Sequence, residues 1–160
     1  MKILIVSDTH GNLRNFDRVI EREKGIDMLL HMGDVEGDED YLEAVMDCPV
    51  YVIAGNNDFF SDLPREQEIR IGQHKVFMTH GHSYYVSVGT SRLKQAAQAR
   101  GADIVMYGHT HRPDIDTEGN VIAINPGSLS YPRQEGRKAT YIIMEVSDAG
   151  EVTCTLKYID

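Results

Sequence analysis

Five short polar segments carry the side chains that can do chemistry, and each of them directly follows an apolar run. Carboxylate, carboxamide and imidazole groups without a thiolate suit borderline divalent cations such as Mn²⁺, Fe²⁺, Co²⁺, Ni²⁺ and Zn²⁺. We therefore predict a metal site, provided that the fold brings the segments together. The segments are Asp8-Thr9-His10, Gly33-Asp34, Gly55-Asn56-Asn57-Asp58, His80-Gly81-His82 and Gly108-His109-Thr110-His111.

The apolar runs are the elements that must position these segments. Their shortness and their content of valine and isoleucine indicate buried β-strands. Ligands of open α/β sheets bind beyond the carboxyl ends of the strands, so all five segments are expected at one edge of the predicted sheet. Taken singly, each segment is equally typical of a turn or a helix cap. The runs cover residues 3–6, 28–32, 50–54, 76–79 and 104–107.

Helices are expected between the runs, and hairpins in the second half of the chain. Helical periodicity predicts one helix after an N-cap at Asn12, a second from Asp38 toward Cys48, and a third from about residue 90 to Gly101. Short alternating runs after residue 110 predict antiparallel strands, including 139–146 and 151–158. The expected fold class is α/β in a single domain over residues 1–160, with a largely parallel first half and an antiparallel second half.

In their order along the chain, the five segments resemble the signature of the calcineurin-like metallophosphoesterase superfamily, which reads DxH, GD, GNH(E/D), H and GHxH. The match spans residues 8–111, and the small size and the Asn125-Pro126-Gly127-Ser128 segment resemble the small single-domain bacterial and archaeal phosphodiesterase branch. This resemblance implies a four-layer α-β-β-α sandwich of two mixed sheets. It also implies two metal ions, one held by Asp8, His10, Asp34 and His111 and the other by Asp34, Asn56, His80 and His109, with Asp34 as the bridge.

The function that the resemblance implies is a metal-dependent phosphodiesterase. Such an enzyme hydrolyses a small or activated phosphodiester by in-line attack of a metal-bridging hydroxide. Manganese is our first choice for the two divalent ions, with Ni, Fe, Co and Zn as alternatives. A phosphomonoesterase on the same dinuclear centre and a non-catalytic interaction scaffold of the same fold are the alternative functions. The complete ligand set favours catalysis over the scaffold.

One position departs from the family signature. The superfamily usually has a histidine where Asn57 stands, and this histidine is thought to help protonate the leaving group. A carboxamide donates a hydrogen bond but supplies no proton near neutral pH, so good leaving groups are favoured or another residue takes over. His82 is the nearest candidate for that role. We expect Asp58 to orient a ligand histidine by accepting its second N–H.

Composition limits the partners and the location. The 160 residues include 16 basic and 25 acidic side chains, a formal net charge of −9 that argues against non-specific nucleic-acid and anionic-membrane binding. Two cysteines, Cys48 and Cys154, form no CxxC pair and favour a reducing cytoplasm. The N-terminal apolar run is too short for a signal peptide, and no stretch approaches the length of a membrane span. The expected partner is a small phosphodiester substrate, and the sequence is compatible with both a monomer and a homo-oligomer.

Overall fold

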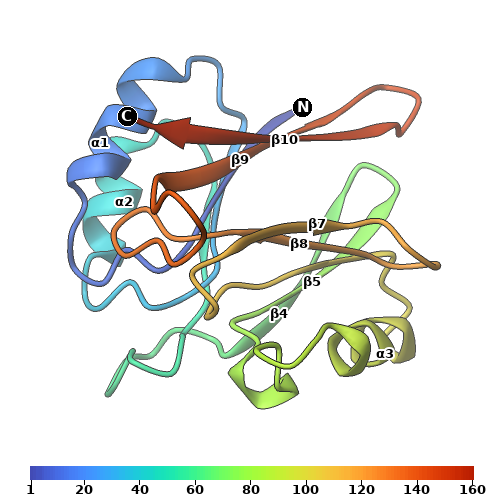
Figure 1. Ribbon diagram of the computed structural model, residues 1–160. Helices are drawn as coiled ribbons and strands as arrows, with labels where there is room; N and C mark the ends of the chain where they lie inside the picture. Colours follow the sequence, from blue (N-terminus) through green and yellow to red (C-terminus); the bar gives the residue numbers. More distant parts are fainter.

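The computed structural model describes residues 1–160 and contains two five-stranded sheets that face each other (Figure 1). The first sheet has the order β10-β9-β1-β2-β3, with β1 (Lys2–Val6), β2 (Met28–His31), β3 (Val50–Val52), β9 (Ala139–Val146) and β10 (Val152–Ile159). The second has the order β4-β5-β6-β8-β7, with β4 (Glu66–Ile71), β5 (His74–Thr79), β6 (Ile104–Met106), β7 (Pro113–Asp116) and β8 (Ile122–Pro126).

Helices cover the outer faces of both sheets. The first sheet packs against α1 (Arg14–Arg22) and α2 (Glu39–Val45), and the second packs against α3 (Ser91–Ala99), on the opposite side of the molecule in Figure 1. A short 3₁₀ helix, η1 (His82–Tyr84), follows β5. The implied four-layer α-β-β-α sandwich is therefore confirmed. None of the helices has the length and apolar character that a membrane span requires.

The central strands are largely apolar because both of their faces are buried. Side chains alternate between the faces of a strand, so Ile3 and Ile5 of β1 pack between the two sheets, while Leu4 and Val6 pack toward the helices. Phe16 of α1 lies in the second of these clusters. Each fully buried side chain of this kind contributes about 1.5–3 kcal/mol to stability. This burial fixes the strand ends from which the polar segments project.

The five predicted strands are present but are divided between the two sheets. β1, β2 and β3 pair in parallel in the first sheet, whereas β5, β6 and β8 pair in parallel in the second. β9 lies antiparallel to β1, so the C-terminal hairpin completes the first sheet. Both sheets are therefore mixed, and the expected split into a parallel and an antiparallel half of the chain is wrong. Long-range pairing decides which strands become neighbours, and the strand pattern does not encode it.

Two local expectations also differ from the structure. The strand β4 (Glu66–Ile71) was not expected, because it lies on an edge of the second sheet and begins with three polar residues, with only Ile69 and Ile71 apolar. Asn12 does not occupy the N-cap of α1, since Leu13 holds that position without a side-chain cap. The side chain of Asn12 instead accepts a hydrogen bond from the N–H of Arg14 at 3.2 Å, which forms a turn before the helix.

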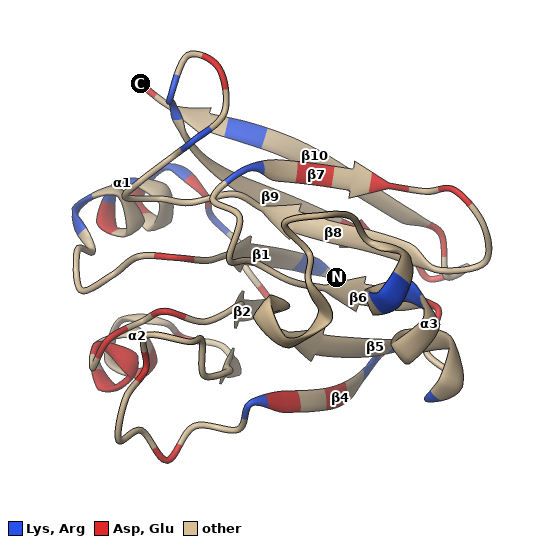
Figure 2. Ribbon diagram, turned by 60° about the horizontal axis from the view of Figure 1, so that its bottom comes forward, with Lys and Arg blue, Asp and Glu red and all other residues tan.

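Acidic side chains are spread over the molecule, and both α2 and β4 carry some of them (Figure 2). A different acidic group, Glu23 at the end of α1, is buried under a cluster of donors that ties the helix to the first sheet. Its carboxylate accepts hydrogen bonds from Lys157 at 2.6 Å and Tyr141 at 2.8 Å, and it pairs with Lys2 at 3.0 Å. Burial raises the pKa of Glu23, but these three partners lower it by more, to about 2.

Replacing Glu23 with Gln is expected to destabilise the fold by up to about 3 kcal/mol at neutral pH, since each unit of pKa depression corresponds to about 1.4 kcal/mol. The depressed pKa also predicts that wild-type stability is fully present above the usual value of 4.5 and is lost as the pH falls toward 2. Denaturant unfolding at pH 7 and pH 3 measures both effects. Glu21→Gln, which changes an exposed carboxylate on the same helix, is the control. Equal stability of the two variants at pH 7 would contradict this role of Glu23.

Candidate metal centre

The polar segments of both sheets meet at one edge of the molecule. The tightest group is formed by four of the seven predicted metal ligands, which offer one ligand atom each within 4.8 Å of one another, namely Asp8, His10, Asp34 and His111. Two of these residues follow β1, one follows β2 and one follows β6. Because the two sheets face each other, the carboxyl ends of strands from both open on the same space.

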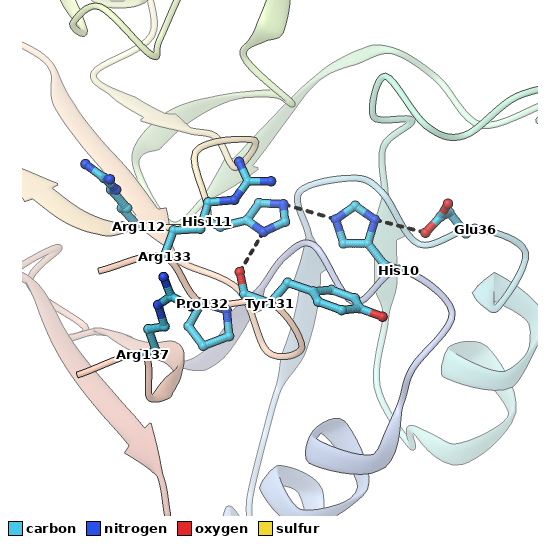
Figure 3. A pocket seen from close by; sticks show the side chains of 8 residues that line it. All are labelled: His10, Glu36, His111, Arg112, Tyr131, Pro132, Arg133 and Arg137. Atoms are coloured by element: carbon cyan, nitrogen blue, oxygen red, sulfur yellow. Dashed lines mark hydrogen bonds and ion pairs between the residues drawn. The ribbon is translucent and has the colours of Figure 1, made fainter. Parts of the chain in front are cut away.

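The Nε2 atoms of His10 and His111 face each other (Figure 3). Nδ1 of His111 donates to the carbonyl oxygen of Tyr131 at 2.7 Å, and Nδ1 of His10 donates to Glu36 at 2.9 Å. With Nδ1 donating, each Nε2 atom holds a lone pair whenever its ring carries a single proton. These atoms lie 3.0 Å apart. Two lone pairs at that distance repel each other unless a cation lies beside them.

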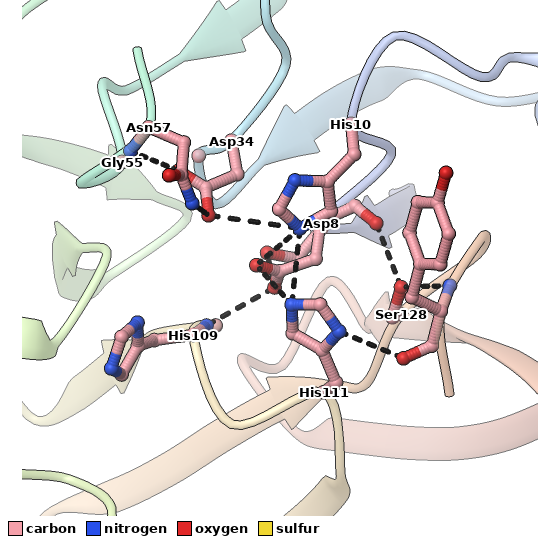
Figure 4. Close-up of polar contacts among 12 residues, drawn as sticks. Asp8, His10, Asp34, Gly55, Asn57, His109, His111 and Ser128 are labelled. Atoms are coloured by element: carbon pink, nitrogen blue, oxygen red, sulfur yellow. Dashed lines mark hydrogen bonds and ion pairs between the residues drawn. The ribbon is translucent and has the colours of Figure 1, made fainter. Parts of the chain in front are cut away.

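Two carboxylates face the same nitrogens (Figure 4). Oδ1 of Asp8 lies 3.2 Å from Nε2 of His111, and Oδ2 of Asp34 lies 3.7 Å from Nε2 of His10. Burial raises the pKa of Asp8, but the neighbouring imidazoles and the Ser7 hydroxyl lower it by more, and the pKa of Asp34 is likewise held below its usual range against the effect of burial. Both aspartates are therefore ionised and can bind a cation.

His80 completes this arrangement from β5. Its Nδ1 donates to the carbonyl oxygen of Met32 at 2.7 Å, while its buried Nε2 has no hydrogen-bond partner and lies 3.4 Å from Asp34. Oδ1 of Asp8 is also buried without a hydrogen bond. Burial lowers the pKa of His80, but the carboxylates of Asp34 and Asp8 raise it by more. A proton on His80 thus competes with a divalent cation for the same position.

The remaining predicted ligands lie on the more open side of the centre. Nδ1 of His109 is 3.0 Å from Oδ1 of Asn56, and the His109 ring lies 5.2 Å from that of His80. The main-chain N–H of His109 also donates to Asp8 at 3.1 Å. All seven predicted ligands are thus neighbours, although His109 and Asn56 are less enclosed than the group around Asp8.

Backbone conformation at this edge is unusual. Several of the site residues adopt a positive φ, which costs a residue with a side chain about 1 kcal/mol or more and persists only where the surrounding structure enforces it. Such strain gathers at functional sites, so its position here supports a role for these loops in binding. The predicted ligands concerned are Asp8 (φ 53°), His10 (49°), Asp34 (56°), His109 (69°) and His111 (57°).

Asp58 has a different role from the one expected. Its carboxylate accepts main-chain N–H groups from Asp34 at 2.8 Å, Glu36 at 2.7 Å and Gly55 at 2.7 Å. It therefore joins the loops after β2 and β3 and contacts no ligand histidine. The expectation that Asp58 orients a histidine is wrong, because the second N–H groups of the histidines are taken by backbone carbonyls and by Glu36.

Asn57 and His82, the two predicted catalytic residues, lie differently relative to the centre. The main-chain N–H and the side-chain amide of Asn57 both donate to Asp34, at 2.8 and 2.9 Å. His82, in η1, places its ring 5.6 Å from that of His80 and 5.9 Å from that of His109, and its buried Nδ1 has no partner. Burial lowers the pKa of His82. Asn57 is thus engaged with Asp34, whereas His82 is free.

Three side chains that hold the loops were missed at the sequence level. Asn125 donates to the carbonyl oxygen of Gly108 at 3.1 Å, and the Ser128 hydroxyl donates to the carbonyl oxygen of Asp8 at 2.7 Å. Glu36 holds His10, as described above. The signal for the first two was available, because Asn125-Pro126-Gly127-Ser128 follows an apolar run in the same way as the five segments that are predicted to bind metal. These anchors explain why the segment belongs to the site.

Comparisons with known proteins agree with this geometry. The family model of the calcineurin-like phosphoesterase superfamily domain matches residues 1–149. The probable metallophosphoesterase YsnB of Bacillus subtilis is 31% identical over 155 residues, covering 95% of this chain and 89% of that protein. The phosphodiesterase YfcE of Escherichia coli K12 is 28% identical over 169 residues, covering 91% of this chain and 88% of that protein.

A solved structure shares the fold. Vps29 of Entamoeba histolytica, crystallised with Zn²⁺, has a TM-score of 0.79 at 21% identity and covers 99% of each chain. At that identity the likeness concerns the fold alone. With the converging segments, the family match and the related sequences taken together, the chain is a metallophosphoesterase and belongs to the calcineurin-like phosphoesterase superfamily.

Proposed function

We propose that this metallophosphoesterase is a phosphodiesterase with a dinuclear metal centre that hydrolyses a small or activated diester. The observation that supports the proposal best is that buried polar atoms at this edge have no hydrogen-bond partner, above all Oδ1 of Asp8 and Nε2 of His80. Asp8, His10, Asp34 and His111 would hold one ion, and Asp34, Asn56, His80 and His109 the other. Two bound ions lower the pKa of a shared water and neutralise charge on the phosphate oxygens.

Manganese is the ion that we propose, because the donor atoms are oxygen and imidazole nitrogen without sulfur. The same donor set accommodates Ni, Fe, Co or Zn. The cytoplasm is the proposed location, on the ground that Cys48 and Cys154 are both free thiols.

The chain's own residues would prepare the centre for a phosphate group. Glu36, Met32 and Tyr131 each accept the Nδ1 proton of a different histidine and so fix which nitrogen faces the ion. Asn57 fixes the orientation of the Asp34 carboxylate through two hydrogen bonds. We assign Asn57 to positioning Asp34 and His82 to assisting the departure of the leaving group, because Asn57 is engaged with Asp34 while the His82 ring lies 5.6 Å from that of His80 and 5.9 Å from that of His109.

Replacing His82 with Ala is expected to slow hydrolysis of a phenyl ester by about tenfold more than hydrolysis of the corresponding p-nitrophenyl ester, because nitrophenolate leaves without assistance. Asn57→Ala is expected to slow both esters alike, since it loosens Asp34. Steady-state kinetics on methyl phenyl phosphate and methyl p-nitrophenyl phosphate measure the two effects. An equal loss on both esters in the His82 variant would remove His82 from this role.

The diester preference is tested by comparing bis(p-nitrophenyl) phosphate with p-nitrophenyl phosphate in the presence of Mn²⁺. The proposal predicts a kcat/KM at least about tenfold higher for the diester. The reverse ratio would identify a phosphomonoesterase on the same centre. Two bound ions without turnover of either ester would identify an interaction scaffold of this fold. The name of the relative YfcE supports the diester outcome.

A further inference from the structure

A hollow of about 880 Å³ opens beside the metal centre, on the side of His10 and His111 (Figure 3). Three arginines, Arg112, Arg133 and Arg137, line this arginine hollow together. Arg112 directly follows His111, and the main-chain N–H of Arg133 donates to the carbonyl oxygen of His111 at 2.9 Å. The backbones of two arginines are thus fixed to the loop that carries a predicted metal ligand.

The three guanidinium groups have no protein partner. None of them forms an ion pair or a side-chain hydrogen bond, whereas several cations elsewhere do, such as Lys94 with Asp116 at 2.8 Å. Acidic side chains outnumber basic ones in this chain, 25 to 16. The lack of a carboxylate partner for these arginines is therefore not explained by a shortage of acidic residues. The result is a concentration of positive charge beside the centre of an acidic protein.

The loop before β9 presents the third arginine in a strained conformation. Arg137 has a φ of 45°, a left-handed conformation that an arginine adopts at a cost, and its N–H donates to the carbonyl oxygen of Gln134 at 3.0 Å. The turn between these two residues includes Gly136, which supplies a positive φ of its own. This tight turn reverses the direction of the chain, so that Arg137 lines the same hollow as Arg133.

We propose that the arginine hollow binds a second phosphate group of the substrate, carried by the ester substituent that stays on the phosphoryl group when the leaving group departs. This inference rests on the proposed function. A terminal phosphate carries a charge of about −1.5 to −2 at pH 7 and three acceptor oxygens, which suits several guanidinium groups better than a carboxylate with two oxygens and a single charge. The volume of the hollow is in the range of sites that hold ligands of nucleotide size.

The charges around the metal centre indicate on which side of it the anionic substituent of the substrate lies. The one carboxylate of the arginine hollow, Glu36, lies beyond His10 on the side away from the arginines, and it is already bonded to His10 (Figure 3). A second hollow, on the His109 side, shares Arg112 and Arg133 but contains the carboxylate of Asp114. An anionic substituent therefore meets three arginines and a carboxylate already bonded to His10 in the first hollow, against two arginines and a carboxylate in the second, and the first hollow is favoured.

The test compares two substrates that differ only in the second phosphate: thymidine 5′-(p-nitrophenyl phosphate) with and without a 3′-phosphate. We expect the wild-type kcat/KM to be about tenfold or more higher with the 3′-phosphate. The double variant Arg112→Gln/Arg133→Gln is expected to bring the ratio to about one. Arg70→Gln, which removes an exposed, unpaired arginine from β4 at the opposite edge of the second sheet, is expected to keep the wild-type ratio.

A binding measurement keeps this test independent of turnover. Calorimetry with thymidine 3′,5′-bisphosphate and thymidine 5′-monophosphate is expected to show about tenfold tighter binding of the bisphosphate to the wild type, and no such difference for the double variant. Equal binding of the two nucleotides to the wild type would overturn the proposal, as would a double variant that keeps the preference. If the chain hydrolyses the ester without a 3′-phosphate as well as the one with it, the proposed phosphate site in the arginine hollow is wrong, but the phosphodiesterase activity stands. If the chain binds the bisphosphate selectively and hydrolyses neither ester, the proposed phosphodiesterase activity is wrong, but the phosphate site stands.

Discussion

Asp34→Asn is expected to abolish hydrolysis of bis(p-nitrophenyl) phosphate, with a loss of more than about 100-fold, because even the loss of an outer partner of a metal ligand costs about 10–100-fold. Asp34 is the residue that faces both halves of the centre, with Oδ2 at 3.4 Å from His80 and 3.7 Å from His10. Its low pKa shows that the surroundings favour the charged form. A neutral amide would provide neither the charge nor the second oxygen.

Two measurements check this expectation. Metal analysis after purification without chelator should give two ions per chain for the wild type and fewer for the variant, and a diester assay should follow the metal content. Asp62→Asn, which changes an exposed aspartate without a partner, is the control for net charge. Unchanged metal content and hydrolysis in the Asp34 variant would overturn the catalytic interpretation.

Gly55→Ala is expected to have the second-largest effect, although it removes no chemical group. A Cβ atom at Gly55 would lie 2.5 Å from the main-chain nitrogen of Asp34 and closer still to its carboxylate. Asp58 holds the N–H of Gly55 at 2.7 Å, so the loop has little freedom to move away. The added methyl group must therefore displace Asp34. We expect a loss of stability of about 1–3 kcal/mol and a metal affinity lowered by at least about tenfold.

The matched control is Gly89→Ala, because a Cβ atom at Gly89 would meet nothing within 4 Å and the backbone there is not left-handed. Manganese titration followed by calorimetry measures the affinity, and thermal unfolding with and without Mn²⁺ measures the stability. If Gly55→Ala binds manganese as tightly as Gly89→Ala does, the close packing of the loops after β2 and β3 is not what positions Asp34.

Individual elements of the fold could be predicted because their signals are local. The runs around Ile5, Leu30 and Val105 are apolar apart from His31, and the structure buries them on both faces. The sequence pattern could not predict how these strands divide between two sheets, because the division depends on which strands pair across long stretches of chain. Only the family resemblance supplied the sandwich. The edge strand β4 was missed because half of its residues face solvent.

The candidate ligands could be proposed from sequence because donor residues follow strand ends, where the backbone turns. Their partners were harder to foresee. Glu36 reaches His10 and Ser128 reaches Asp8 through contacts between distant segments, and neither residue type is unusual in a loop. Asp58 was assigned the wrong partner, because a carboxylate beside a ligand motif accepts backbone N–H groups as readily as an imidazole proton.

Anomalous scattering from a manganese-loaded crystal tests the central claim most directly. The account predicts two manganese peaks about 3.5–4 Å apart, as in other two-metal sites, with the carboxylate of Asp34 contacting both. One peak should lie among Asp8, His10 and His111, and the other among Asn56, His80 and His109. A crystal grown in manganese with no peak at this edge of the sheets, or with peaks that Asp34 does not touch, would contradict it.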